Sequence, residues 1–354
     1  MSYQASSALV LQGGGALGAY ELGAARALYA DKTFAPDLIA GVSIGAITAV
    51  LLARPAKGLK RPLEALEAFW EKVAIRAEAF PPPLRQYASL FGDDKFFVPR
   101  LDYFALPSWT YIYETEPLRR TLEQLVDTDA LSDPKATPRL LVSATDLEEG
   151  QIEYFYSGKD GLSLDHIIAS GSLPPSFPKT DIKNKSYWDG GLFDNTPLGA
   201  VLDKLNDAPG VDRTVYVVNL FPNKGPVPRN LLEVMARMQN LQFANKTAED
   251  LKMMCRFDQV AALMEALENF PGGNPLADND AYKAVKAQGY VLVPNIIPIT
   301  RPQQVGEWDP ADFSPETIKK RADEGRAQTE QALREHASRP RVDLCTRLLK
   351  SGAV

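Results

Sequence analysis

Residues 8–18 read Ala-Leu-Val-Leu-Gln-Gly-Gly-Gly-Ala-Leu-Gly, and residues 38–45 read Leu-Ile-Ala-Gly-Val-Ser-Ile-Gly. In each stretch a short apolar run ends in a glycine-containing turn, and an alanine-rich segment follows, at residues 19–30 or 46–53. Short apolar runs next to glycine are typical of buried strands, and alanine favours helix. The pattern therefore predicts strand, tight turn and helix twice over, with both turns at one edge of a parallel sheet.

A serine lies at the centre of the second turn, Gly41-Val42-Ser43-Ile44-Gly45, which has the pattern Gly-x-Ser-x-Gly. Between a strand and a helix this pattern holds serine at a sharp elbow, where small neighbours let substrate and backbone approach closely. The first turn, Gly13-Gly14-Gly15, would direct backbone N–H groups from a helix N-terminus out of the same sheet edge. The two turns therefore predict an oxyanion site beside a nucleophile, with Ser43 as the nucleophile.

A serine nucleophile needs a base to take its proton, and histidine is the usual one. The chain has only two histidines, His166 and His336. His166 lies in a stretch that favours helix, and His336 lies in a charged helical stretch typical of a solvated face. Because neither position favours a histidine base, the sequence points to a dyad in which an aspartate accepts the proton.

Asp189 is the strongest candidate for that aspartate. It follows an aromatic strand end, Tyr187-Trp188, and precedes Gly190-Gly191, which allow close approach and positive φ. A carboxylate is a weaker base than imidazole in water, but burial raises its pKa toward the operating range. The alternative is an ordinary Asx turn, which Asp-Gly often forms, and Asp194 just downstream is more typical of a helix cap.

The first turn also fits a second kind of site. Gly13-x-Gly15-x-x-Gly18 after a strand matches the dinucleotide-binding fingerprint, and Asp31 lies near the expected acidic position. This alternative leaves Ser43 and Asp189 without a role, so the combined pattern favours a hydrolase. Retention of a nicotinamide or flavin cofactor would favour the alternative.

Three motifs in a fixed order resemble the patatin-like phospholipase family. They are Gly-Gly-Gly-Ala-Leu-Gly at residues 13–18, Gly-Val-Ser-Ile-Gly at 41–45 and Asp-Gly-Gly at 189–191, and the resemblance spans about residues 8–222. Together the motifs are far more specific than any one of them. The run at residues 169–178 also resembles the family's loop before the aspartate.

The resemblance implies a role for each motif. Ser43 would be the nucleophile, Asp189 the base and orienting partner, and the N–H groups of Gly14 and Gly15 the oxyanion donors, with Ile44 as a further donor. The motif glycines would be Gly18, Gly41, Gly45, Gly190 and Gly191. Leu17 stands where the family often carries Arg or Lys, so the resemblance gives no headgroup preference.

Composition excludes some classes of protein. With 39 Lys and Arg against 45 Asp and Glu, the net charge of −6 argues against a nucleic-acid partner. No secretory signal is apparent, and the longest apolar run, residues 38–53, is shorter than the roughly 20 residues that span a bilayer. Cys255 and Cys345 cannot form a disulfide framework. We therefore expect a cytoplasmic protein, with peripheral membrane contact as a further hypothesis and the oligomeric state left open.

The membrane hypothesis depends on an aromatic segment at residues 80–113, which holds nearly a third of the chain's aromatic residues among prolines and loop residues. Such a segment either packs back onto the core or forms a lid or pocket wall that meets an acyl chain or a membrane interface. Basic residues that would suit an anionic surface, although such clusters are usually solvated, are Lys57, Lys60, Arg61, Lys179, Lys183 and Lys185.

The remaining patterns complete an α/β fold. Helices are expected over residues 62–78, 117–126, 164–170 and 314–335, and strands over 139–145, 152–156, 215–220 and part of 290–299. Residues 231–269 would form one long helix or two. We expect an α/β/α fold of three layers with a mostly parallel central sheet. A catalytic domain would span residues 1–225, and a mainly helical extension, residues 226–354, would pack on it.

These observations predict hydrolysis of an acyl ester of a phospholipid or related lipid through an acyl-serine intermediate. One alternative keeps the chemistry but changes the substrate, to a shorter ester, a thioester or a storage polyester. The other is a catalytically silent protein that binds a lipid or a partner. No cofactor is predicted, and no metal, because the sequence has neither a histidine cluster nor a calcium-loop pattern.

Overall fold

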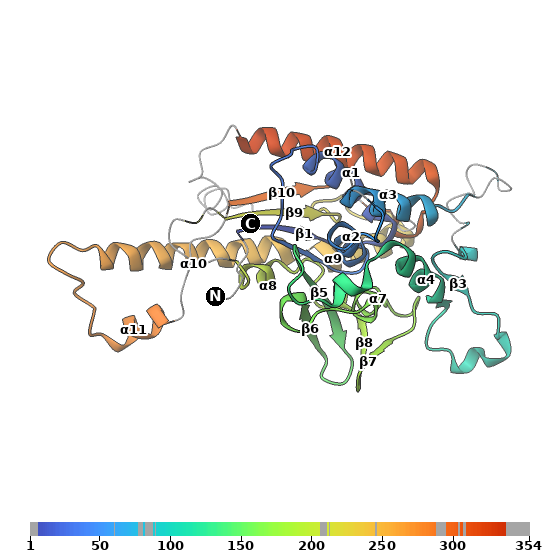
Figure 1. The fold of residues 1–354 in the computed structure, drawn as a ribbon, viewed down its shortest axis with the longest axis horizontal. Helices are drawn as coiled ribbons and strands as arrows, with labels where there is room; N and C mark the ends of the chain where they lie inside the picture. Colours follow the sequence, from blue (N-terminus) through green and yellow to red (C-terminus); the bar gives the residue numbers. More distant parts are fainter. Residues whose placement is uncertain are drawn as a thin grey trace.

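The computed structural model describes residues 6–59, 61–76, 81, 88, 90–205, 211, 213–244, 246–287, 295–303, 305–306 and 309–337 (Figure 1). Lys60, Cys345, residues 290–294 and residues 80, 82–87 and 89 of the aromatic segment lie outside this part of the chain. Every structural statement below concerns the described residues.

Both predicted strand–turn–helix units are present. They consist of β1 (Ser7–Leu11), the 3-10 turn η1 (Gly15–Gly18), α1 (Ala19–Leu28), β2 (Leu38–Gly41) and α2 (Ile44–Ala53). β1 and β2 pair in parallel, and their last residues, Leu11 and Gly41, lie opposite each other. The glycine turn and the serine turn therefore leave the same edge of the sheet, as the pattern predicts.

An eight-stranded sheet lies at the centre of the fold, in the order β10-β9-β1-β2-β5-β8-β7, with β6 paired to β5 beside this path. Its further strands are β5 (Arg139–Asp146), β6 (Gln151–Tyr156), β7 (Thr180–Ile182), β8 (Lys185–Asp189), β9 (Thr214–Asn219) and β10 (Asn295–Thr300). The pairs from β10 across to β5 are parallel, and the pairs with β6, β7 and β8 are antiparallel. The mostly parallel sheet predicted from the sequence is confirmed.

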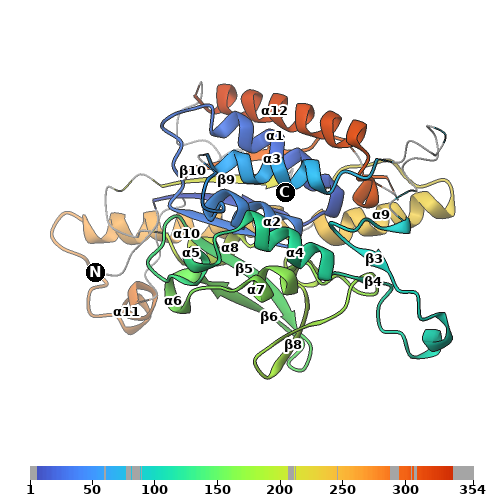
Figure 2. The same cartoon turned by 45° about the vertical axis from the view of Figure 1, so that its right-hand side comes forward.

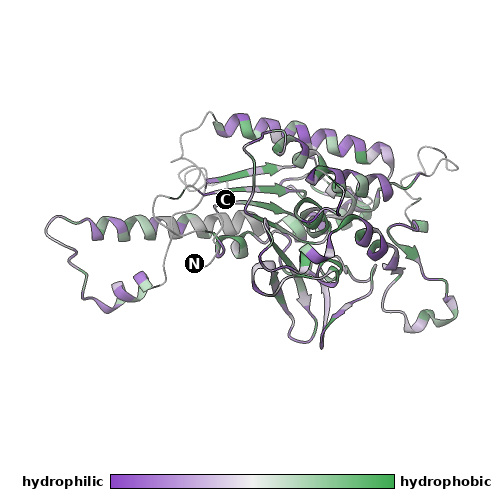
Figure 3. Ribbon diagram, viewed as in Figure 1, coloured by the Kyte–Doolittle hydropathy of each residue, from purple (hydrophilic) through white to green (hydrophobic). Residues whose placement is uncertain are grey.

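Helices cover both faces of the sheet. Leu9 and Leu11 of β1 pack with α1 and α2 in one apolar cluster, while Ala8 and Val10 pack with α8 in another, because successive strand residues point to opposite faces. Figure 3 shows the apolar strands between helices that carry hydrophilic residues. Further helices are α3 (Pro62–Lys72), α4 (Glu116–Leu125), α5 (Thr128–Ser132), α6 (Ser157–Asp160), η4 (Gly190–Leu192), α7 (Leu164–Ser170) and α8 (Leu198–Leu202).

The region after residue 225 adds one strand and several helices. Beside β10 these are α9 (Leu231–Ala244), α10 (Lys246–Glu268), α11 (Asp280–Ala287), η5 (Asp309–Ala311) and α12 (Pro315–Ala337). The stretch expected to hold one long helix or two holds α9 and α10, and the helix expected over residues 314–335 is α12. β10 pairs in parallel with β9, so this region extends the central sheet as well as packing on it. The division into domains at residue 225 stays a prediction.

α12 crosses α1 at a close contact between two backbones. A Cβ on Gly23 of α1 would overlap the carbonyl oxygen of Ala322, and a Cβ on Gly325 of α12 would overlap that of Tyr20. Glycine at both positions lets the helices approach more closely than any side chain would allow. Figures 1 and 2 both show α12 lying along α1.

Residues 90–113 form a ribbon that leaves the body of the protein beside α4 (Figure 1). β3 (Val98–Pro99) pairs antiparallel with β4 (Tyr113–Glu114), and η3 (Tyr103–Ser108) lies between them. Phe96 and Phe97 at the base of the ribbon are buried in the core, whereas no residue of η3 is buried. The aromatic segment thus both packs on the core and exposes apolar side chains.

Within the described ranges, no helix is both long and apolar enough to cross a lipid bilayer. Cys255 on α10 is buried and is not a free thiol. The cytoplasmic location expected from the sequence stays a prediction.

Candidate active site

Ser43 stands at the tip of the turn between β2 and α2. Its backbone has φ 55° and ψ −122°, a conformation that non-glycine residues rarely adopt and that costs about 1–3 kcal/mol. A Cβ on Gly41 would overlap the backbone of Gly45, and a Cβ on Gly45 would lie 2.5 Å from the carbonyl oxygen of Leu11. The Ser43 N–H donates to the Ser170 hydroxyl at 3.0 Å. The flanking glycines and this hydrogen bond therefore hold the strained elbow in place.

The glycine turn after β1 lies beside Ser43. A Cβ on Gly13 would come within 3.1 Å of the Ser43 Cβ, so the two backbones are almost in contact. No described residue accepts a hydrogen bond from the N–H of Gly14, Gly15 or Ile44. The turn and the start of α2 thus leave backbone donors available next to the serine hydroxyl.

Gly13 is held differently from the two glycines that follow it. Its N–H donates to the Asn195 carbonyl oxygen at 3.3 Å, and its carbonyl oxygen accepts from the Asn195 side-chain amide at 3.1 Å. Any Cβ on Gly13 would overlap Asn195 Oδ1. Asn195 therefore fixes Gly13 from both sides and accepts the hydrogen bond of its N–H.

Asp189 ends β8 next to Ser43 and is 2% exposed. Its carboxylate accepts a hydrogen bond from the Gly191 N–H at 2.7 Å, and the Ser43 side chain lies close enough to lower its pKa. Its backbone N–H donates to the Ser172 carbonyl at 3.0 Å, and its carbonyl accepts from the Thr145 hydroxyl at 2.8 Å. The Asx turn considered from the sequence is therefore present, and the same turn aims the carboxylate at the serine.

Burial raises the pKa of Asp189 to about 7, because the charged carboxylate loses its hydration. The Ser43 side chain and the Gly191 N–H lower this pKa, but less than burial raises it. No cation among the described residues shifts it. Near neutral pH the carboxyl group can therefore both accept and release a proton.

Gln12, the residue between β1 and the glycine turn, connects four parts of the site. Its Oε1 accepts from the N–H groups of Leu220, at 2.6 Å, and Phe221, at 3.0 Å. Its Nε2 donates to the Thr196 hydroxyl at 2.9 Å and to the Phe243 carbonyl at 3.1 Å. Gln12 was not predicted to have a role. The sequence did contain a signal for it, because Gln12 is a single polar residue between an apolar strand and a glycine turn.

A pocket of about 400 Å³ opens onto Ser43, Asp189 and the glycine turn. This volume lies within the range of small-ligand sites, about 300–1,000 Å³. Most of the remaining wall is apolar and includes Leu90, Ile112, Leu173, Phe177, Phe243 and Phe313. A second cavity of about 50 Å³, also largely apolar, adjoins Ser43 and Ile44. The site thus combines a few polar groups with apolar walls, an arrangement that suits an acyl ester.

The two histidines lie away from this pocket. At the start of α7, His166 accepts the Ser163 N–H at 3.0 Å, and burial lowers its pKa. His336 hydrogen-bonds Asn295 at 2.6 Å. Neither ring lines the pocket. A search of the described residues finds no group of three or more His, Cys, Asp or Glu that could hold a metal ion.

Two other acidic residues considered from the sequence also have local partners. Asp31 accepts from the N–H and hydroxyl of Thr33 in the loop before β2. The expectation that Asp194 caps a helix is wrong, because α8 begins only at residue 198. Asp194 instead accepts hydrogen bonds from the Tyr154 hydroxyl, at 2.6 Å, and from the Thr196 N–H, at 3.2 Å. These bonds fix the segment that contains Asn195, the residue that hydrogen-bonds Gly13.

Known proteins were compared with the chain at the level of sequence and of structure. A family model described as patatin-like phospholipase matches residues 9–202. No curated protein sequence matches. Among solved structures, the chain is similar to VipD from Legionella pneumophila, with 16% identity and a TM-score of 0.39, covering 94% of this chain and 67% of VipD. It is also similar to a chain of the SpcU–ExoU complex from the type III secretion system of Pseudomonas aeruginosa, with 17% identity and a TM-score of 0.28, covering 68% of this chain and 50% of that one.

The family match covers more than half of the 354 residues and includes the glycine turn, the serine turn and the Asp189 turn. It accounts for all three motifs, whereas the dinucleotide-binding alternative accounts for only the first. The chain belongs to the patatin-like phospholipase family, a family of lipid hydrolases.

Proposed function

We propose that this protein hydrolyses fatty-acyl esters of phospholipids or related lipids through a dyad of Ser43 and Asp189. The observation that carries this proposal is the meeting of three groups in one pocket: Ser43 at its strained elbow, the glycine turn, and the buried carboxyl group of Asp189, whose pKa is about 7. An aspartate with an ordinary pKa near 4 would be a much weaker base toward serine. Burial therefore supplies the basicity that a histidine supplies in other serine hydrolases.

The reaction needs two transfers of the acyl group. As Ser43 Oγ attacks the ester carbonyl carbon, Asp189 accepts the hydroxyl proton, and it then gives this proton to the leaving alcohol. The acyl group is now bonded to Ser43. Water attacks the acyl-serine ester while Asp189 takes a proton from it, and that proton returns to Ser43 Oγ as the fatty acid leaves.

The developing oxyanion would be bound by the N–H groups of Gly14, Gly15 and Ile44. These donors have no acceptor among the described residues, and the first turn of α2 adds the positive end of a helix dipole. Because backbone donors are already oriented, they need no reorganisation as charge develops in the transition state. In this proposal Gly13 shapes the turn, since Asn195 occupies its N–H.

Product analysis tests this function directly. Wild-type protein incubated with phosphatidylcholine vesicles is expected to release free fatty acid and lysophospholipid, and a fluorophosphonate is expected to label Ser43. Both are read by mass spectrometry. Cleavage restricted to short soluble esters, thioesters or polyesters would contradict the lipid substrate. Absence of both products and label would favour the alternative, a catalytically silent protein that binds a lipid or a partner.

The proposal includes contact with a membrane through apolar side chains at the mouth of the pocket. The ribbon lines the pocket with Leu90 and Ile112, and α9 lines it with Gln239 and Phe243. The same two elements expose large apolar side chains, here called the mouth surface: Leu101, Tyr103, Phe104, Leu106, Leu231, Leu232, Met235 and Met238. An exposed apolar area beside a lipid pocket suits an interface with lipid.

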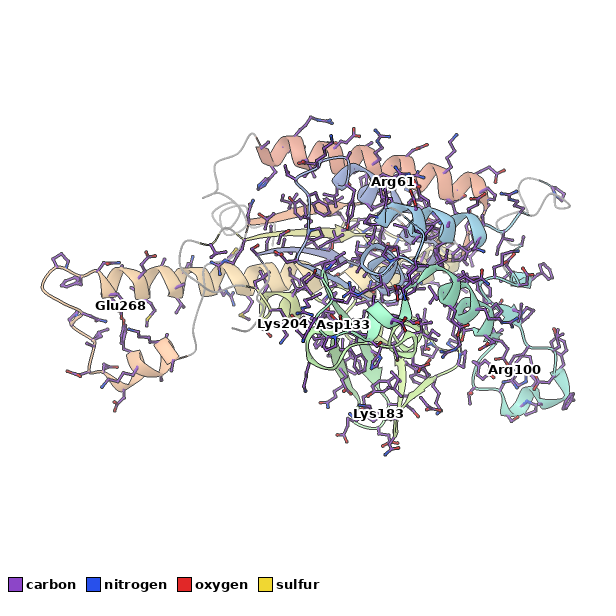
Figure 4. The ribbon with its side chains drawn as sticks, in the orientation of Figure 1. Arg61, Arg100, Asp133, Lys183, Lys204 and Glu268 are labelled. Carbon is purple, nitrogen blue, oxygen red and sulfur yellow. The ribbon has the colours of Figure 1, made fainter. Side chains whose placement is uncertain are left out.

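Arg100 orders the tip of the ribbon (Figure 4). Its guanidinium lies 4.7 Å from the ring centroid of Trp109 and 4.6 Å from that of Tyr111, and it pairs with Asp102 at 2.6 Å. Cation–π contacts at exposed sites are worth about 0.5–1 kcal/mol each. These contacts join the residues just before η3 to the residues just after it.

The basic residues considered from the sequence make a weaker case for membrane contact. Several are paired with acidic side chains, as in Lys57–Asp129, Arg61–Glu64, Lys179–Asp181 and Lys185–Asp146. Paired charges add little attraction to an anionic surface. We therefore assign membrane contact to the mouth surface.

Replacing Phe104 and Leu106, which are 92% and 57% exposed, with aspartate tests this contact. Because burying each side chain is worth about 1.5–3 kcal/mol, vesicle binding and hydrolysis of vesicle lipid should fall at least 10-fold. Hydrolysis of a soluble short-chain ester should not change. The control is Phe270→Asp, a 51% exposed phenylalanine two residues after Glu268, which lies at the opposite end of the molecule from Arg100 (Figure 4). Unchanged co-sedimentation of the double variant with vesicles would contradict the assignment.

A further inference from the structure

The chain between β10 and α12 reaches the candidate active site. Pro310 and Ala311 of η5, together with Phe313, line the pocket that contains Ser43. These residues lie far beyond residue 202, where the family match ends. Residues 309–313, here called the wall segment, are therefore a part of this pocket that the matched region does not contain.

The wall segment packs against the glycine turn. Gly15 has φ 56°, and a Cβ added there would overlap the carbonyl oxygen of Pro310. The turn therefore has no room to move toward the wall segment. Because Gly14 and Gly15 carry two of the proposed oxyanion donors, the position of Pro310 limits where those N–H groups point.

Two buried arginines hold the start of the wall segment. The side chains of Arg301, just after β10, and Arg321, on α12, are each 4% exposed. Arg301 lies 3.7 Å and Arg321 3.5 Å from the carboxylate of Asp309, which also accepts the Gly306 N–H at 2.9 Å. Burial lowers the pKa of both guanidinium groups, and Asp309 raises it. Asp309 is 34% exposed and is the nearest carboxylate to both cations; Glu324 also raises the pKa of each arginine.

The other end of the wall segment is fixed at the start of α12. Arg321 donates to the Asp312 carbonyl at 3.0 Å, and the Asp312 carboxylate accepts from the Ser314 N–H and the Thr317 hydroxyl. Phe313 is 3% exposed, and its ring stacks on Trp70 with the centroids 6.1 Å apart. Its backbone is therefore held by α12, and its ring is held by the core.

We propose that the wall segment is part of the active site: it keeps the glycine turn in the conformation that binds the oxyanion, and it forms the wall that limits the acyl chain. Asp309, Arg301 and Arg321 act as positioning residues, and Ala311 acts as a specificity residue. This inference rests on the proposed acyl transfer at Ser43.

The first test replaces Asp309 with asparagine. With a soluble chromogenic ester, kcat should fall roughly 10- to 100-fold, because donors displaced from the oxyanion stabilise the transition state less. KM should change little, since the apolar pocket remains, and Asp309→Glu should recover most of the loss. The control is Glu330→Gln, which removes the ion pair with Arg326 farther along α12 and should leave kcat unchanged.

A second measurement does not depend on activity. Amide hydrogen exchange at residues 13–18 should be faster in Asp309→Asn than in wild type or in Glu330→Gln. In a folded Asp309→Asn variant, exchange at the wild-type rate would overturn the inference whether or not the protein hydrolyses esters, and a wild-type kcat would overturn it as well. Failure of the proposed function would instead appear as wild-type protein that neither hydrolyses esters nor reacts with a fluorophosphonate.

The wall is tested with Ala311→Leu. A larger side chain at a residue that lines the pocket should lower kcat/KM for a long-chain ester about 10-fold relative to an acetyl ester, an effect typical of altered apolar pockets. An unchanged chain-length profile would remove Ala311 from the proposal.

Discussion

Ser43→Ala is expected to lower kcat for ester hydrolysis by on the order of 10⁴-fold or more, as loss of a serine nucleophile does in other hydrolases. Without Oγ no acyl-enzyme forms, and the donors of the glycine turn assist only a direct attack by water. Steady-state kinetics with a short chromogenic ester measure the loss. The fluorophosphonate adduct should disappear from the peptide that contains residue 43.

Ser43→Gly separates the chemistry of this residue from its backbone strain. Glycine adopts φ 55° without strain, so this variant should be as inactive as Ser43→Ala but unfold at a higher temperature. Ser132→Ala, at an exposed serine at the end of α5, should behave like wild type. If Ser43→Ala kept a substantial fraction of the activity, another residue would have to be the nucleophile.

Asp189→Asn is expected to lower kcat roughly 10²- to 10⁴-fold, the usual contribution of a general base. The amide keeps the shape of the side chain and still accepts from the Gly191 N–H, but it cannot take the serine proton. Glu21→Gln is the matched control, because the Glu21 carboxyl is also buried and also has a pKa raised by burial, yet it does not line the pocket. Equal losses in the two variants would contradict a specific role for Asp189.

The pH dependence of the same enzymes follows from the pKa of Asp189. Only the ionised form accepts a proton, so wild-type kcat/KM should rise with pH, level off above about pH 7, and fall about 10-fold per unit below it. Asp189→Asn should lack this rise. For stability the sign is opposite: the raised pKa favours the protonated carboxyl in the folded state, so the contribution of Asp189 to stability is lost as the pH rises from about 4 to about 7 and changes no further above that. Asp189→Asn should therefore be no less stable than wild type at pH 8.

The motifs that could be predicted from the sequence are local ones. Ser43 and the glycine turn each lie within a few residues of the strand and helix that position them, so short patterns contain the necessary information. Asp189 needed one more argument, the scarcity of histidine, because an Asp-Gly turn alone is common. The fold class followed from the repeated strand–turn–helix pattern.

The supporting contacts could not be predicted because they join distant parts of the chain. Gln12 donates to the carbonyl of Phe243, 231 positions later, and Asn195 donates to Gly13, 182 positions earlier. No periodicity or turn preference encodes such pairs, which depend on how complete elements pack. For the same reason the sequence placed Gly13 among the oxyanion donors and could not reveal that Asn195 occupies its N–H.

β10 shows the same limit at the level of the sheet. Its apolar run indicates a strand, and Pro298 suits an edge position, where a missing N–H is tolerated. In the described chain, however, the helices α9, α10 and α11 separate it from its partner β9. The pattern could therefore identify a strand but could not show that it continues the central sheet, nor that the residues after it reach the pocket.

The glycine contact between α1 and α12 has a consequence for the geometry of the pocket. Gly325 follows Arg321 by four residues, so both lie on one face of α12. A slide of α12 along α1 by one helical turn, about 5.4 Å, would bring a side chain against the backbone at the crossing, so only one alignment of the two helices fits. Gly23 and Gly325 therefore fix the position of α12 along α1. The position of α12 in turn determines where Arg321 lies, and with it Asp309 and the wall segment that lines the pocket.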